Sequence, residues 1–172
     1  LASIYHPNFL RLHDAFVEES EGNLYILTEY CLLSTLEEAS LTNLKTKKNN
    51  QQPAFSVQGR GLIIAELLNG LKELNRRGLA YSNFNLNDIL VTDKGNIKLS
   101  GLHKILISGT DIPKKQNLDP RFTAPENLIV RKVRSASNIY SAGVMLHYIT
   151  YNCLPYEGTN NKEITSQVIQ GK

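Results

Sequence analysis

The strongest constraint on the fold of this chain is a helical repeat of apolar residues that leads, through a polar loop, into a short hairpin. The apolar positions are Ile64, Leu67, Leu68, Leu71 and Leu74, and Arg76-Arg77-Gly78 follows them. This spacing predicts a helix with one buried face that ends near Gly78. The sequence Asp-Lys-Gly-Asn, between the apolar runs 89–91 and 97–99, predicts the turn of a hairpin. The loop at 81–88 therefore connects two predicted elements.

This loop has the frame of a protein-kinase catalytic loop. It reads Tyr-Ser-Asn-Phe-Asn-Leu-Asn-Asp, where kinases have His-Arg-Asp and, after four further residues, Asn. Further landmarks follow in the order that kinases have them: His6-Pro7-Asn8 with the alternating run 9–16, the run 23–31, Gly101-Leu102-His103, Ala124-Pro125-Glu126, and the run 137–143. Essentially the whole chain resembles the protein kinase superfamily. The run 23–31 is most like that of the Nek group of Ser/Thr kinases.

The resemblance implies an α+β, protein-kinase-like fold, mostly the helical large lobe with the last strands of the small lobe. It assigns residues 1–31 to the end of the small lobe and the hinge, and residues 32–172 to the large lobe. Because 172 residues are few for a kinase domain, we expect a partial domain that lacks the late helices. The core should form around Leu67, Leu71, Ala142 and Leu146. The polar segment 45–52 is expected to be a flexible surface insertion.

The positions that carry kinase chemistry are replaced, so the resemblance implies a degenerate kinase, or pseudokinase. Asn83 stands where the catalytic aspartate takes the proton of the substrate hydroxyl, and a carboxamide has no useful basicity. Asn85 stands where a lysine neutralises the transferring phosphoryl group. Gly101 replaces the aspartate that binds magnesium and offers no side-chain oxygen. No catalytic residue is therefore expected to be intact.

The metal and nucleotide positions leave alternatives open. Asp88 stands where kinases have a metal-binding asparagine, and it is either a magnesium ligand or a carboxylate that caps a turn or faces solvent. Glu29, Tyr30 and Cys31 match the hinge, and Leu90 matches the floor of an adenine pocket, although apolar strand residues are commonly core. The resemblance therefore makes no cofactor certain, and ATP and magnesium are weak expectations.

Four substitutions near the loop concern its support. Tyr81 and Leu102 replace the histidine and phenylalanine that stack inside the large lobe, and we expect both to be core residues. Ser82 replaces the arginine that clamps a phosphorylated activation loop, so activation by phosphorylation there is not expected. Asn138 replaces a buried aspartate, and its amide donors need partners of their own. We expect it to hold the loop less rigidly.

Composition narrows the classes of partner. The formal net charge of +3, from 19 basic and 16 acidic residues, is small and dispersed, which argues against nucleic acid. No apolar run reaches spanning length, so a membrane is not expected as a partner either. Cys31 and Cys153 lack metal-ligand spacing and suit a reducing, cytoplasmic setting.

The function that these observations favour is a catalytically impaired kinase-like domain that acts as an interaction or regulatory module. Its expected partner is a protein, such as an active kinase or a scaffold. One alternative is a residual ATP-binding switch, and another is an atypical active Ser/Thr protein kinase that uses Asp88. A fourth alternative is a remnant without function.

Overall fold

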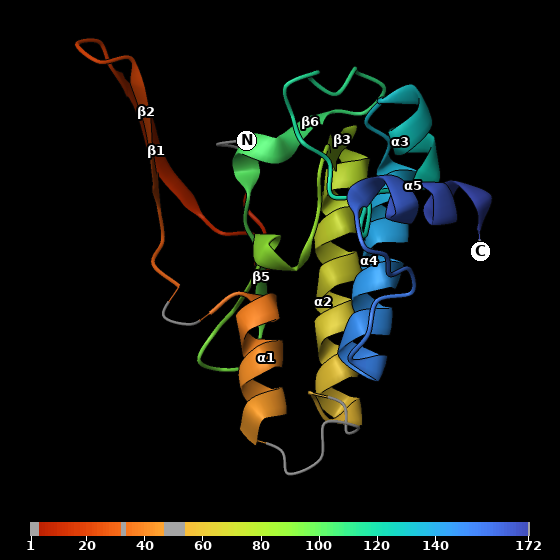
Figure 1. The fold of residues 1–172 in the computed structure, drawn as a ribbon. Helices are drawn as coiled ribbons and strands as arrows, with labels where there is room; N and C mark the ends of the chain where they lie inside the picture. The colour runs from red at the N-terminus through yellow and green to blue at the C-terminus, as the bar shows by residue number, and fades with distance from the viewer. Residues whose placement is uncertain (1–3, 32–33, 47–53, 172) are drawn as a thin grey trace.

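The computed structural model describes residues 4–31, 34–46 and 54–171. Figure 1 shows a two-stranded ribbon near the N-terminus, a group of helices, and short strands above and beside them. This mixture of helices and small antiparallel sheets confirms the predicted α+β class. Most of the predicted insertion, residues 47–52, lies outside the described residues. Within the described part of the chain, no helix combines the length and the apolar character needed to cross a membrane.

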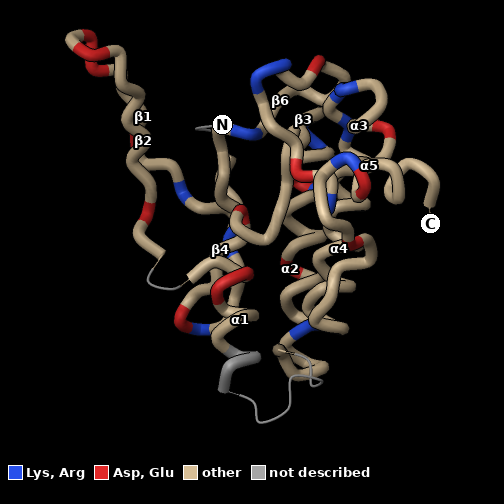
Figure 2. The backbone as a smooth tube through the Cα atoms, viewed as in Figure 1, with Lys and Arg blue, Asp and Glu red and all other residues tan. Residues whose placement is uncertain are grey.

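The ribbon consists of β1 (Leu12–Glu18) and β2 (Asn23–Thr28), which pair antiparallel. Phe16 lies opposite Tyr25, and their rings stack with centroids 5.3 Å apart. The ribbon stands away from the helices in Figure 1, and acidic residues gather at its tip in Figure 2. Apolar side chains on both of its faces are exposed: Phe16, Val17, Leu24, Tyr25, Ile26 and Leu27. The basic residues in Figure 2 are spread over several elements.

The long predicted helix is α2 (Val57–Arg76), and α1 (Leu36–Thr46) precedes it. The hydroxyl of Ser56 accepts a hydrogen bond from the backbone N–H of Gly59 at 3.1 Å, which satisfies one free donor at the start of α2. Gly78 follows the helix in the left-handed region, at φ 68°, so the predicted end is confirmed. A Cβ on Gly70 would lie 2.5 Å from Leu99, which shows how closely α2 packs against β5 (Ile97–Leu99).

One predicted core position is wrong, and one residue of the apolar repeat is exposed. Leu68 is 42% exposed, and Ile63 is buried instead. Leu146 is also partly exposed, whereas Met145 is buried. The buried face of α2 includes Gly70, a residue that hydrophobicity does not mark, so the apolar pattern placed the face one position away from Ile63. Leu67 and Leu71 are buried as predicted.

Short strand pairs position the loop. β3 (Leu79–Tyr81) pairs antiparallel with β6 (Ile105–Ile107), and β4 (Ile89–Val91) pairs antiparallel with β5. The second pair is the predicted hairpin, with Ile89 opposite Leu99. The loop leaves β3 and enters β4, so it is held at both ends by a strand pair. Two short 3-10 helices, Leu86–Asp88 and Leu102–Lys104, lie beside these strands.

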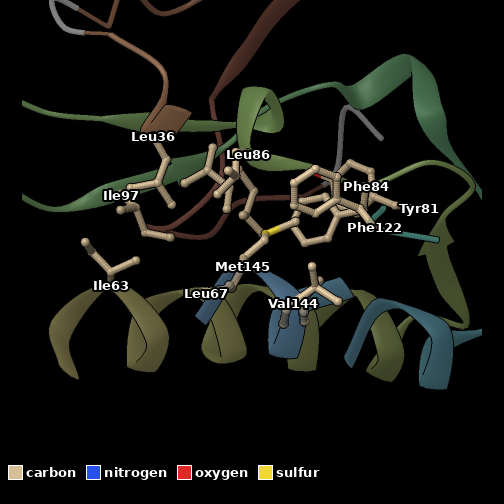
Figure 3. Close-up of a cluster of buried hydrophobic side chains, with 14 of the residues drawn as sticks. Leu36, Ile63, Leu67, Tyr81, Phe84, Leu86, Ile97, Phe122, Val144 and Met145 are labelled. Atoms are coloured by element: carbon tan, nitrogen blue, oxygen red, sulfur yellow. The ribbon is translucent and has the colours of Figure 1, made fainter. Parts of the chain in front are cut away.

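The remaining helices are α3 (Pro125–Val130), α4 (Ser135–Tyr151) and α5 (Asn161–Gln170). α4 lies alongside α2 in Figure 1. The core fills the space between these two helices and the strands above them. Figure 3 shows this cluster, in which Tyr81, Phe84 and Phe122 lie close to Met145.

Candidate functional site

Tyr81 anchors the start of the loop. Its side chain is 1% exposed, as the core interpretation predicted, and its ring stacks on Phe84 with centroids 4.4 Å apart. The hydroxyl donates a hydrogen bond of 2.6 Å to the carbonyl oxygen of Ser100. Burial, and after it the charge of Asp88, raises the pKa of Tyr81 well above its ordinary value. The hydroxyl therefore stays protonated and serves as a donor. Leu102 is half-buried and packs against the same core.

Asn138 holds Tyr81 from the other side. With the carboxamide oriented to suit its neighbours, its oxygen accepts from the Tyr81 N–H at 2.9 Å and its nitrogen donates to the Tyr81 carbonyl at 3.1 Å. The side chain comes from the first turns of α4 and is 4% exposed. The second bond gives an amide donor the partner that it needs. Asn138 thus holds both backbone groups of one loop residue.

Asn85 and Asp88 cap the short helix at the end of the loop. The Asn85 side chain accepts a hydrogen bond from the backbone N–H of Asn87 at 3.0 Å. In return, Oδ2 of Asp88 accepts from the backbone N–H of Asn85 at 3.0 Å. Such a reciprocal arrangement satisfies donors that the helix itself leaves free. Asn85 is therefore a structural residue of the loop in this fold.

Asp88 is turn-capping and buried, at 3% exposure, so the solvent-facing interpretation is wrong. Its second oxygen, Oδ1, forms an ion pair with Nζ of Lys104 at 2.6 Å. Lys104 lies three residues after Gly101, and no sequence pattern marked it. Both carboxylate oxygens of Asp88 therefore have a donor from the protein.

Gly101 lies directly against Asp88. Its backbone is left-handed, at φ 65°, and a Cβ added there would overlap Oδ1 of Asp88. A side chain at 101 would require Asp88 or the local backbone to move. The glycine thus permits the close approach of the loop to the segment that follows β5.

Asn83 points toward a different side of the loop. Its Nδ2 donates to the carbonyl oxygen of Asn117 at 3.1 Å, while Oδ1 is buried without a hydrogen-bond partner. The residue borders a cavity of about 440 Å³ that is also lined by Asp119, Arg121 and residues 158–161. Among the contacts that the structure describes, none joins Asn83 to Asp88 or to Gly101.

The comparisons with known proteins identify the family. The model of the protein kinase domain matches residues 1–172 of the chain. This chain belongs to the protein kinase family. The kinase-like interpretation of the fold is therefore confirmed.

Several Ser/Thr kinases are similar to this kinase-family chain. Serine/threonine-protein kinase Nek2 of Homo sapiens is 25% identical over 179 residues, which cover the whole chain and 39% of the relative. Serine/threonine-protein kinase STK11 of Gallus gallus is 26% identical, over 99% of the chain and 39% of the relative. Ribosomal protein S6 kinase 2 alpha of Xenopus laevis is 27% identical, over the whole chain and 22% of the relative. The predicted similarity to Nek kinases is confirmed, and the chain spans at most about two fifths of these relatives' length.

The residues present do not fit the magnesium ion that kinase chemistry uses. Magnesium prefers six oxygen ligands in octahedral geometry, usually including one or two carboxylates. Gly101 supplies no side-chain oxygen, and a protein donor engages each oxygen of Asp88. Among residues 4–31, 34–46 and 54–171, no group of three or more acidic, histidine or cysteine side chains could hold a metal ion.

Ser82 connects the loop to residues 113–116 of this kinase-family chain. Its hydroxyl donates to the carbonyl oxygen of Lys104 at 2.8 Å and accepts from Nε2 of Gln116 at 2.7 Å. The guanidinium of Arg131 donates to the carbonyl oxygens of Pro113 and Gln116, both at 3.0 Å. The Ser82 hydroxyl and the Gln116 carboxamide, both neutral, thus join the loop to residues 113–116, and the charged guanidinium of Arg131 holds that segment. Sequence reasoning missed Gln116 because its distance from Ser82 along the chain gives no signal.

Glu29, one of the residues predicted to form the hinge, is held by two hydrogen bonds. Oε1 of Glu29 accepts from Nζ of Lys98 and from the backbone N–H of Arg11, both at 2.7 Å. Partial burial raises the pKa of Glu29, but the hydrogen bonds from Lys98 and Arg11 outweigh it, so the pKa lies below its ordinary value. This ion pair borders a cavity of about 280 Å³.

The other nucleotide candidates are more scattered. Tyr30 projects into solvent, at 85% exposure, and Cys31 is half-buried. Leu90 is half-buried in β4, opposite Lys98 of β5. The cross-strand pair of Leu90 and Lys98 therefore brings the predicted pocket floor next to the ion pair of Lys98 with Glu29. The role of these residues in binding adenine stays a prediction.

Proposed function

We propose that this kinase-family chain is a catalytically impaired domain, a pseudokinase, that works as an interaction or regulatory module. The observation that carries the proposal is the contrast within one loop. Tyr81 is bonded to Asn138 and Ser100, so the frame of the loop is kept. Asn83, at the position of the proton acceptor, is a carboxamide, and its amide donates to Asn117. A positioned general base contributes roughly 10²–10⁴-fold to a rate, and no carboxylate stands at this position.

The partner that we propose is a protein, either an active kinase or a scaffold. A domain that keeps a kinase fold without transfer chemistry can bind surfaces that kinases bind, and the similarity to Nek2 makes a Nek-type kinase the first partner to test. The proposal places the domain in the cytoplasm, where its two free thiols, Cys31 and Cys153, would stay reduced.

The first experiment measures phosphoryl transfer from ATP to a generic Ser/Thr acceptor in the presence of magnesium. We expect no transfer above that of a protein-free control, for the wild type and for Asn83→Asp alike. The variant restores a base, but Gly101 still supplies no side-chain oxygen to bind the metal ion. Wild-type transfer that Asp88→Ala abolishes would overturn the proposal and support the atypical active kinase. Titration calorimetry of ATP, with and without magnesium, separates the module from the ATP-binding switch. Saturable binding would support the switch.

The second experiment tests the partner. The chain is mixed with the catalytic domain of an active Nek-type kinase, and association is followed by sedimentation velocity while the turnover of the active kinase is measured. An inert protein of similar size and net charge is the control. We expect a complex and a changed turnover. Absence of a complex would overturn the proposal that an active kinase is the partner. It would not affect the proposal of impaired catalysis, which the first experiment tests.

A further inference from the structure

We propose that the ammonium group of Lys104 is the resident cation of the Asp88 carboxylate, and that it keeps a divalent metal ion out of this position. The inference concerns the metal chemistry of the loop and does not depend on whether the domain binds a protein partner. It follows from the misfit between magnesium and the groups around Asp88.

The first argument is the geometry of the pair. Nζ of Lys104 lies 2.6 Å from Oδ1 of Asp88, while Oδ2 accepts from the N–H of Asn85. The Asp88 side chain is 4% exposed and that of Lys104 is 20% exposed. Among the described ion pairs, no other carboxylate is as deeply buried. A buried carboxylate needs a compensating charge, and Lys104 supplies it.

The second argument is that the backbone of Lys104 is held in place. Its N–H donates to the carbonyl oxygen of Gly101 at 2.8 Å, and its own carbonyl oxygen accepts from both the N–H and the hydroxyl of Ser82. These three hydrogen bonds thus fix the backbone position from which the Lys104 side chain extends. From this backbone position the Lys104 ammonium group reaches Asp88 directly. This favours the ion pair over side-chain conformations that extend into solvent.

The third argument concerns what a metal ion would have to displace. Oδ1 of Asp88 faces both Lys104 and the empty side-chain position of Gly101. A divalent ion on Oδ1 would sit beside a positive charge in a buried environment, and like charges at such short range repel strongly. It would gain a single carboxylate in exchange, since Gly101 contributes no oxygen. The charge of Lys104 therefore opposes a metal ion at the one carboxylate that could hold it.

The test uses Mn²⁺ alone as the probe, with the free ion measured by electron paramagnetic resonance. We expect no saturable site at Asp88 in the wild-type chain up to millimolar Mn²⁺. Lys104→Met removes the charge and keeps much of the side-chain length, and we expect it to create a site at least about tenfold tighter than any in the wild type, because the like-charge repulsion is gone. Adding Asp88→Asn to Lys104→Met should remove that site.

Two controls keep the result specific. Lys98→Met removes a lysine of similar exposure that pairs with Glu29. This variant should create no Mn²⁺ site at Asp88. Lys104→Arg retains a cation and should exclude Mn²⁺ as the wild type does. Circular dichroism and an unfolding transition establish that each variant is folded, and Lys104→Gln replaces Lys104→Met if the latter is not.

Two outcomes would overturn the proposal. One is a folded neutral variant at 104 that gains no site, since the lysine would then not be what excludes the ion. The other needs no variant at position 104: amide signals of the wild type are recorded with Mn²⁺, and paramagnetic broadening centred on Asn85 to Asp88 would show a metal ion at the carboxylate. Broadening confined to other parts of the chain agrees with the proposal.

Discussion

The β1–β2 ribbon and the loop between β3 and β4 contain similar side chains but are held in different ways. In the ribbon, Phe16 stacks on Tyr25 and remains 54% exposed. In the loop, Tyr81 stacks on Phe84 and is 1% exposed, because α4 and the strands cover it. The stabilisation from an aromatic pair follows the apolar area removed from water. Local pairing alone therefore does not make a region stable, and the loop gains its stability from elements distant in sequence.

The largest expected difference between the two regions is at their aspartates. Asp88→Ala removes the partner of Lys104 and the acceptor for Asn85, and we expect it to lower the free energy of unfolding by about 3–5 kcal/mol. Asp14→Ala, in the exposed β1, should change it little. Urea denaturation of both variants measures the difference. Equal stability of the two variants would show that the buried pair adds nothing to the fold.

The second prediction compares two leucines. Leu67→Ala in α2 creates a cavity in the core, and we expect a loss of about 2–5 kcal/mol. Leu27→Ala in β2 removes a side chain that is 57% exposed and should cost far less. Denaturant midpoints, with the slopes compared, give both values. A loss at Leu27 as large as that at Leu67 would mean that the ribbon face is covered in solution.

The third prediction compares two tyrosine hydroxyls. Tyr81→Phe leaves the Ser100 carbonyl without its donor, and we expect a loss of about 1 kcal/mol. Tyr25→Phe breaks a bond to Glu18 on the exposed ribbon, where water can replace it, so stability should stay nearly unchanged. Thermal unfolding followed by circular dichroism compares the two. A larger loss for Tyr25→Phe would reverse the comparison.

The smallest effect is expected from a charge cluster at the end of α2, which lies outside both regions. Hydrogen bonds from Arg76 and Arg77 lower the pKa of Glu73 from 4.5 to about 2. Since the folded-state pKa is the lower one, the carboxylate stabilises the fold above pH 4.5, and this contribution is lost as the pH falls toward 2.

The check on Glu73 is a comparison with Glu73→Gln. The wild type should be slightly more stable than the variant at neutral pH, and the difference should vanish as the pH falls through this window. Because Glu73 lies at the surface, solvent screening keeps the effect small. A difference that stays constant down to the lowest pH would contradict the assignment of the pKa.

Sequence reasoning predicted the elements well but not which way their side chains face. The helix at Val57–Arg76 and the hairpin of β4 with β5 agree with the apolar periodicity and turn chemistry. Leu146 was assigned to the core wrongly, and Leu68 of the apolar repeat is exposed, because apolar spacing alone does not fix the angle at which a helix packs against its neighbour. Gly70 contributes to that face through its lack of a side chain, which no hydrophobic pattern reveals.

In the candidate site, too, the sequence predicted some features and gave no sign of others. The sequence pointed to Asn83, Asn85 and Gly101 as candidate positions through their resemblance to the fixed spacing of kinase motifs. The support of the loop could not be anticipated: Asn138 satisfies both backbone groups of Tyr81, where a weaker hold was expected. The contact of Ser82 with Gln116 joins residues 34 positions apart, and such contacts have no signature in local sequence.

The sequence by itself determined the family and predicted α2 and the β4–β5 hairpin, because these follow from residue types at fixed spacing, and it places a carboxamide at position 83 and a glycine at position 101. Only the tertiary structure decided the state of Asp88. A carboxylate can bind a metal ion, cap a turn or face water, and the choice depends on the groups that surround it in space. Here the folded chain places it beside Lys104 and the N–H of Asn85, away from solvent. Its oxygens are thereby engaged within the protein.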